Sequence, residues 1–171
     1  MQSTLETEPG FTLATWQHRP ESAGYVRATS NDPFAKPVIQ PNYLAHENDQ
    51  RVIVAAMKLC RQLMHTEALA PFLVSEAYPG CDAQSDEDLL DAARNIGQSI
   101  YHLMGTCRMG PSQDRHAVVD DQLRVHGIDN LRVVDASIMP TMISANLNAG
   151  VMMIAEKGAD MILGKEPPVL Q

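Results

Sequence analysis

One of the six histidines stands in a segment that is typical of a catalytic loop. His102 opens the stretch 102–110, which mixes apolar residues with glycines, shows neither helical nor strand periodicity, and directly follows a predicted helix. Catalytic groups are often placed on loops that rigid elements hold in position, and an imidazole near neutral pH can take a proton from a hydroxyl group. His102 is therefore a candidate base, whereas structural or solvent-exposed roles are favoured for the other five histidines.

A second candidate site lies nearer the C-terminus. Residues 130–135 predict a strand that leads through a turn to a helix beginning at about Asn148 and ending near Gly164. The first N–H groups of such a helix lack intrahelical acceptors and carry partial positive charge, so they can receive an anion. The alternative is an ordinary strand–helix connection in which Asn146 or Asn148 caps the helix. Physical reasoning alone favours this alternative.

The motifs of nucleophilic and nucleotide-binding enzymes are absent from the chain. Residues 97–101 fail the G-x-S-x-G pattern at its last position, and neither G-x-G-x-x-G nor G-x-x-x-x-G-K-[ST] occurs. Ser137, His102 and Asp135 could be written as a triad, but any chain of this length offers such combinations. A complete dinucleotide-binding domain is therefore not encoded in these 171 residues.

The three cysteines give no sign of a metal centre. Cys60, Cys81 and Cys107 are widely spaced, and no C-x-x-C pair occurs. A site built from His102, Cys107 and another cysteine lacks any sequence signal for a fourth ligand. We therefore predict three reduced thiols and no metal ion.

The charge balance excludes nucleic acid as a partner. The chain has 13 basic and 21 acidic residues and a formal net charge of −8, whereas binding to a nucleic-acid backbone requires a basic patch that releases counterions. No apolar run approaches the ~20 residues of a membrane span, and no signal-peptide apolar region follows Met1. We expect a cytoplasmic protein without a membrane span, and peripheral attachment to a membrane is left open as an alternative.

The hydrophobic pattern predicts the elements that position these residues. Two adjacent apolar stripes predict a broadly buried helix from about Glu47 to residue 64. Ser85 is a suitable N-cap for a second helix, whose apolar positions run to Ile100. Strands or short extended segments are expected at residues 11–18, 24–29, 37–41 and 118–125.

Several stretches of the chain, taken together, resemble one known family. The sequence His-Leu-Met-Gly-Thr-Cys-Arg-Met-Gly at residues 102–110 resembles the H-x-x-G-T-x-x-M-G signature of the glucose–methanol–choline (GMC) oxidoreductases. Further stretches that are similar to motifs of this family lie at residues 19–26, 41–44, 123–140 and 146–157. The resemblance covers residues 11–164 in order, and the choline dehydrogenase-like branch is the most similar.

This resemblance implies a specific chemistry. GMC oxidoreductases are flavoproteins that oxidise alcohols and pass a hydride to N5 of FAD, and the histidine of the signature, here His102, acts as the base on the substrate hydroxyl. The family's second active-site position falls on Asn146, which lies 44 residues after His102. Asparagine does not titrate, so Asn146 is expected to orient the alkoxide by a hydrogen bond and to leave the base role to His102.

The resemblance also implies a set of cofactor contacts. Asp135 and Ala136 correspond to the family segment that lies along the ribityl chain and pyrophosphate of FAD. Leu147, Asn148 and Ala149 correspond to the backbone that approaches the pyrimidine edge of the flavin. A helix N-terminus at this edge would stabilise negative charge at N1–C2=O of the reduced flavin.

The expected fold class is α+β. By the resemblance, residues 11–126 form mainly the substrate-binding domain, in which an antiparallel sheet is one wall of the pocket, and residues 127–165 form the C-terminal strand–turn–helix of a Rossmann-like FAD-binding domain. Residues 1–10 are expected to be a linker or truncated start, and residues 166–171 a tail. The N-terminal part of the FAD-binding domain, with its glycine motif, is absent from this sequence.

Two functional hypotheses therefore remain open. The first is FAD-dependent oxidation of choline or another primary alcohol, in which the N-terminal FAD-binding portion is the expected partner and a homo-oligomer is allowed. The second is a catalytically inactive C-terminal fragment, or a split partner, that folds but does not bind FAD alone. The missing glycine motif favours the second for the isolated chain, and the intact His102 and Asn146 pair favours the first.

Overall fold

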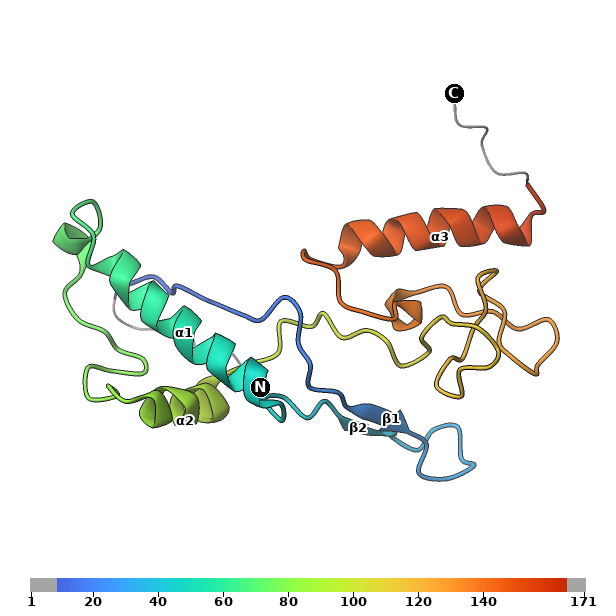
Figure 1. The fold of residues 1–171 in the computed structure, drawn as a ribbon, viewed down its shortest axis with the longest axis horizontal. Coiled ribbons are helices and arrows are strands. Elements are labelled where there is room, and N and C mark those ends of the chain that lie inside the picture. The colour runs from blue at the N-terminus through green and yellow to red at the C-terminus, as the bar shows by residue number, and fades with distance from the viewer. Residues whose placement is uncertain (1–8, 166–171) are drawn as a thin grey trace. The chain divides into compact units, whose positions relative to one another are not determined.

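A computed structural model of the chain describes residues 9–165, and these residues adopt a mixed α+β fold (Figure 1). The described part contains three α-helices, two short 3₁₀-helices and one two-stranded antiparallel sheet, so the expected α+β class is confirmed. The predicted tail at 166–171 and most of the predicted linker at 1–10 lie outside the described residues.

The chain divides into two compact units. One contains residues up to 17 together with residues 44–97, and the other contains residues 18–43 together with residues 98 onward. The sequence-based domain boundary at residues 126 and 127 refers to the domains of a longer enzyme, and it stays a prediction.

The first unit is built on two α-helices, α1 (Glu47–Met64) and α2 (Asp86–Ile96), with the 3₁₀-helix η1 (Ala70–Phe72) between them. Ser85 caps α2 as predicted: its side chain accepts a hydrogen bond from the backbone N–H of Asp88, and the Asp88 carboxylate accepts one from the Ser85 backbone. The helix ends at Ile96 and not at Ile100. Gly97 leaves the helix so close to the Ala93 carbonyl that a Cβ at residue 97 would lie 2.2 Å from that oxygen.

The connection between these helices is held by one arginine. Arg61 forms a fork with the Glu76 carboxylate, with 2.8 Å from Nη2 to Oε1 and 2.9 Å from Nε to Oε2. The same guanidinium donates to the carbonyl groups of Gly80 and Ala83. A planar group with five N–H donors suits this task, because it satisfies a carboxylate and two backbone acceptors together.

The prediction that α1 is broadly buried is wrong. Val54 is buried, but Leu59 is 63% exposed and Leu63 is 46% exposed. Helix α2 packs against α1, and Ile53, Met57, Cys60 and Met64 are half-buried, but no described element of this unit covers Leu59 and Leu63. The pattern thus predicted an apolar face correctly but not what covers it.

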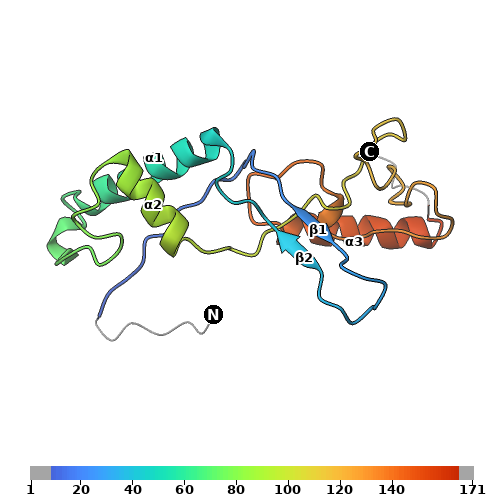
Figure 2. The same cartoon turned by 90° about the horizontal axis from the view of Figure 1, so that it is seen from below.

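The second unit contains a hairpin of β1 (Tyr25–Arg27) and β2 (Val38–Gln40) (Figure 2). Its antiparallel register pairs Tyr25 with Gln40, Val26 with Ile39 and Arg27 with Val38, so the strand expected at 24–29 and the extended segment at 37–41 are confirmed in shorter form. The strand expected at 11–18 is wrong, because residues 11–18 find no pairing strand in the described chain.

The hydrophobic core of this unit lies under helix α3 (Asn148–Ile162). The segments 118–125 and 130–135 pair only through isolated bridges, so the short strands predicted at 118–125 and the strand predicted at 130–135 are wrong. Positive φ angles at Leu123 (63°), Gly127 (76°) and Asn130 (59°) reverse the chain every few residues, so no ladder extends. The buried core residues are Val119, Leu123, Ile138, Met139, Leu147 and Ile154.

Helix α3 approaches the core closely at one glycine. A Cβ at Gly158 would lie 2.5 Å from Cγ1 of Val134, a β-branched side chain with little rotamer freedom. At Gly150, in the same helix, a Cβ would lie 3.2 Å from the flexible ends of Ile143 and Met139. The two glycines therefore have unequal room for a side chain.

We expect Gly158→Ala to be less stable than Gly150→Ala by about 1–3 kcal/mol. Both variants gain helix propensity, but only Gly158→Ala forces a methyl group into a rigid neighbour. Urea unfolding followed by circular dichroism measures the difference. Equal midpoints for the two variants would contradict the close packing of α3 on Val134.

Candidate functional site

The segment that carries His102 is tied to the turn that precedes α3 by three backbone hydrogen bonds. The N–H groups of Gly105, Cys107 and Met109 donate to the carbonyl groups of Ala136, Ser137 and Ile138 at 3.4, 2.9 and 2.7 Å. The acceptors belong to the 3₁₀-helix η2 (Ala136–Ile138). Two of the sequence-predicted segments thus lie side by side in one compact unit.

His102 is half-buried and directly follows a strained residue. Tyr101 has a φ of 60°, which a bulky side chain rarely adopts, and its side chain is 87% exposed. The turn is held by Ser99, whose hydroxyl oxygen accepts from the Tyr101 N–H at 3.0 Å and from the Tyr43 hydroxyl at 2.9 Å. Backbone strain of this kind clusters at functional sites, so the strained turn at Tyr101 supports His102 as a candidate site residue.

No described side chain hydrogen-bonds the imidazole of His102. Gly105, three residues on, has a φ of 85°, a conformation that favours glycine, so the chain turns on both sides of the histidine. The ring is therefore carried by a fixed backbone while its nitrogens stay available for a ligand.

Asp135 sits at the start of η2 and organises the turn. Its Oδ1 accepts hydrogen bonds from the backbone N–H of Ser137 at 2.7 Å and from the Ser137 hydroxyl at 2.5 Å. The Asp135 side chain is exposed, whereas Ala136 is half-buried and packs against the core. The turn consequently presents a carboxylate on the surface next to the segment of His102.

The start of α3 is not capped as predicted. Neither Asn146 nor Asn148 occupies the N-cap position; Leu147 does, and no side-chain hydrogen bond caps the helix. Leu147 is 4% exposed and anchors the helix start in the core, so the two asparagines on either side face outward. The first turn also has no acidic residue. Its N–H groups and their partial positive charge are therefore available to a ligand.

The loop before Asn146 is held from a distant part of the chain. Nε of Arg19 donates to the hydroxyl oxygen of Ser144 at 2.9 Å, across 125 residues of sequence. Asn146 itself is exposed. This hydrogen bond joins the motif at residues 19–26 to the loop that carries the predicted second active-site residue.

The seven sequence-predicted site residues all belong to the same compact unit. Backbone hydrogen bonds join the His102 segment to Ala136, and the shared core joins Leu147 to the turn residue Ile138. Sequence reasoning missed Tyr101, Ser137 and the Arg19–Ser144 contact as supports of the site. Only Ser137 had a local signal, because an aspartate followed two residues later by serine is typical of a side-chain-capped turn.

Arg108, near the end of the signature segment, holds the loop that follows it. The Arg108 guanidinium pairs with the Asp114 carboxylate, and Nε of Arg108 donates to the His116 carbonyl at 3.3 Å. The backbone N–H of His116 hydrogen-bonds Asp114 and, together with the positive charge of Arg108, lowers the pKa of the Asp114 carboxyl below its ordinary value. This loop fixes residues 110–117 against the end of the signature segment.

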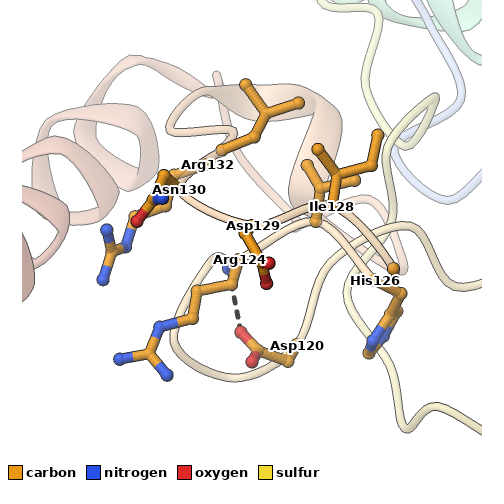
Figure 3. A pocket seen from close by; sticks show the side chains of 10 residues that line it. Asp120, Arg124, His126, Ile128, Asp129, Asn130 and Arg132 are labelled. Carbon is orange, nitrogen blue, oxygen red and sulfur yellow. Dashed lines mark hydrogen bonds between the residues drawn. The ribbon is translucent and has the colours of Figure 1, made fainter.

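Neither of two open cavities in this unit is lined by the predicted site residues. One, of about 520 Å³, is formed by Asp120 and residues 124–132, where Asp120 accepts a hydrogen bond from the Arg124 N–H (Figure 3). The other, of about 660 Å³, includes Met109, His126 and Pro140. Both are open hollows, and neither brings the sequence-predicted site residues together.

No group of three or more His, Cys, Asp or Glu side chains among the described residues is arranged to hold a metal ion. The three cysteines there are free thiols, with Cys81 exposed and Cys60 and Cys107 half-buried. None of the described helices is both long and apolar enough to cross a membrane.

The sequence matches one family model and several curated proteins. A family model described as GMC oxidoreductase matches residues 20–155. The chain is 46% identical over 164 residues to an oxygen-dependent choline dehydrogenase of Escherichia coli O17:K52:H18, covering 96% of this chain and 29% of the relative. It is 47% identical over 158 residues to the enzyme of the same name from Cronobacter sakazakii, covering 92% and 28%.

The fold of the chain also matches solved structures. The chain matches pyridoxine 4-oxidase from Mesorbium loti with a TM-score of 0.76 and 35% identity, over 88% of this chain and 29% of that one. It matches a fungal aryl-alcohol oxidase with a TM-score of 0.75 and 34% identity, over 86% and 24%. The chain thus spans about 29% of the length of the first curated relative that it matches.

The pairing of Asp114 predicts a pH-dependent contribution to stability. Because the folded state lowers the pKa of this carboxyl, its contribution is present above the ordinary value of 3.8 and is lost as the pH falls through the lower folded value. We expect Asp114→Asn to be less stable than the wild type at pH 6. The difference should shrink below about pH 4, because the wild-type carboxyl then becomes neutral as well. Urea unfolding across this range measures it, and a difference that grows on acidification would contradict the assignment.

Proposed function

Because the chain belongs to the GMC oxidoreductase family, we propose that it acts as part of an FAD-dependent enzyme that oxidises an alcohol. The observation that carries this proposal is the hydrogen-bonded contact between the His102 segment and the Ala136 turn, since it joins the family signature to the segment that we assign to the cofactor. Family members act on CH–OH donors. FAD, when bound, supplies the acceptor for the hydride of the alcohol.

The donors and acceptors of this unit fit a flavin. The uncapped first turn of α3, at Asn148 and Ala149, offers N–H donors and partial positive charge, which suit the electron-rich pyrimidine edge. The buried side chain of Leu147 anchors the start of this helix in the core. Asp135 offers an exposed carboxylate oxygen to a hydroxyl group, and Ala136 leaves the turn without a bulky side chain. We therefore assign Asp135, Ala136 and residues 147–149 to FAD.

His102 is the proposed base. Its imidazole has no described hydrogen-bond partner and follows the rigid turn at Tyr101, so it is free to accept the proton of a substrate hydroxyl. The loss of that proton raises electron density on the carbinol carbon, from which the hydride leaves. A positioned base of this type contributes about 10²–10⁴-fold to the rate.

Asn146 is the proposed orienting residue. Its amide donates hydrogen bonds but does not titrate, so it can hold the substrate oxygen without competing for the proton. Its exposed position and the anchoring of its loop by Arg19 and Ser144 agree with this role.

We propose choline or another primary alcohol as the substrate. Two relatives at 46% and 47% identity are named choline dehydrogenases, whereas the structural relatives named pyridoxine 4-oxidase and aryl-alcohol oxidase are 35% and 34% identical. We further propose a cytoplasmic location for the enzyme.

The test needs a full-length protein, meaning one in which residues 1–171 are joined to the N-terminal FAD-binding portion that the proposal requires. In this protein, His102→Ala should slow flavin reduction by about 10²–10⁴-fold, because the substrate then keeps its hydroxyl proton. Stopped-flow absorbance of the flavin measures this rate. Asn146→Ala serves as the comparison and should lose less, since the base remains. Unchanged reduction in His102→Ala, or a larger loss in Asn146→Ala, would reverse the assigned roles.

The full-length protein should purify yellow, with flavin absorbance that choline or another primary alcohol bleaches under anaerobic conditions. Residues 1–171 purified alone should be colourless and gain no flavin absorbance when FAD is added, because they contain no glycine-rich loop for the pyrophosphate. A full-length protein without flavin would overturn the proposed oxidase or dehydrogenase function. A yellow, alcohol-reducible 171-residue chain would overturn the need for a longer partner.

A further inference from the structure

We propose that the hollow formed by Asp120 and the loop at residues 124–132 binds a phosphate-type oxyanion between the guanidinium groups of Arg124 and Arg132. This inference is independent of the proposed alcohol oxidation, because neither arginine is among the residues assigned to FAD or to the substrate. The ligand class includes free inorganic phosphate and the phosphoryl group of a larger molecule, since both present the same oxygen atoms.

The backbone brings the two arginines side by side. Arg124 and Arg132 face each other in an isolated antiparallel bridge. Two backbone hydrogen bonds, of 3.0 and 3.1 Å, flank this pair on either side, and none joins the two arginines to each other. They therefore form a non-hydrogen-bonded pair, the arrangement in which opposite residues approach most closely and direct their side chains to the same face.

The positive charges of this pair are not neutralised within the described chain. Neither guanidinium forms an ion pair there. The Arg124 guanidinium also has no hydrogen bond to a described residue, whereas Nε of Arg132 donates to the Gln122 carbonyl at 3.2 Å and leaves both terminal nitrogens available. Because like charges directly opposite each other are destabilising, an oxyanion between them would relieve repulsion and receive charge-assisted hydrogen bonds.

The loop also leaves room for such a ligand. The hollow has a volume of about 520 Å³, which falls in the range of ~300–1,000 Å³ that is typical of small-molecule pockets. Figure 3 shows the side chains of Arg124 and Arg132 extending toward one side of the loop, away from His126. The two guanidinium groups thus line one part of the hollow.

Two carboxylates that line the same hollow differ in their roles. Oδ1 of Asp120 accepts the backbone N–H groups of Gln122 and Arg124 at 2.9 and 2.8 Å, so this carboxylate holds the loop in shape. Asp129 is exposed and has no hydrogen-bond partner in the part of the chain that the structure describes. Its negative charge opposes the binding of an anion and therefore limits the affinity of the site.

The test measures the binding of inorganic phosphate to the full-length protein by isothermal titration calorimetry, with FAD at saturation so that the cofactor site is filled. Arg124→Gln removes a guanidinium that bonds to no described residue, and phosphate should then bind at least about tenfold more weakly. Arg27→Gln, the matched control, removes the same charge from strand β1 outside the hollow and should leave the affinity within about twofold. An equal loss in both variants would indicate a general charge effect and overturn the site.

Asp129→Asn provides the opposite change. Removal of the competing carboxylate should tighten phosphate binding about fivefold, and this variant still reports if Arg124→Gln fails to fold. Phosphate should also raise the urea midpoint of the wild type but not that of Arg124→Gln. Absence of binding at millimolar phosphate, or affinities unchanged in both variants, would indicate an adventitious ion only and overturn the proposal.

Titration with ADP under the same conditions distinguishes the two sources of the phosphoryl group. Binding that is tighter than that of phosphate and equally dependent on Arg124 supports a larger phosphorylated ligand, whereas weaker binding supports the free ion. If the full-length protein binds no FAD, the proposed function fails, but the phosphate titrations still test the hollow.

Discussion

The backbone hydrogen bonds from Gly105, Cys107 and Met109 to residues 136–138 are the constraint on which the C-terminal unit depends. The segment 102–110 has no regular secondary structure, so its backbone N–H groups find acceptors elsewhere in the chain. They find them in a single 3₁₀ turn whose last residue, Ile138, belongs to the core. The positions of the His102 segment, of the turn at residues 136–138 and of the core are thereby set together. Breaking the turn would release all three.

The sequence predicted most elements whose signals are local. Helix α1, the cap of α2 at Ser85 and the extent of α3 follow from apolar periodicity and capping chemistry, which act within a few residues. The failures depend on distant partners. Residues 11–18 alternate like a strand but find no strand to pair with, and residues 130–135 reduce to one isolated bridge because the chain reverses around them. Such pairing is decided by tertiary structure and leaves no mark in a short window of sequence.

The candidate site also contains some features that the sequence predicted and others that it did not. The motif around His102, and Asn146 at its family spacing, were visible as sequence. The choice of Leu147 as the helix start was not, because it follows from burying one leucine rather than from the capping preference of its asparagine neighbours. The Arg19–Ser144 hydrogen bond joins residues 125 positions apart, and no local rule connects them. Polar supports of a site are thus harder to predict than its reactive groups, since each support is defined only by what it touches.

The close approach of α3 to Val134 has a consequence for how relatives of this chain can vary. With only 2.5 Å between a hypothetical Cβ at residue 158 and Cγ1 of Val134, the two positions share a single volume. A side chain added at one position has to be accompanied by a smaller one at the other, since the helix cannot retreat without withdrawing Ile154 from the core. We therefore expect residues 134 and 158 to vary together among relatives, so that glycine at position 158 accompanies a branched residue at position 134.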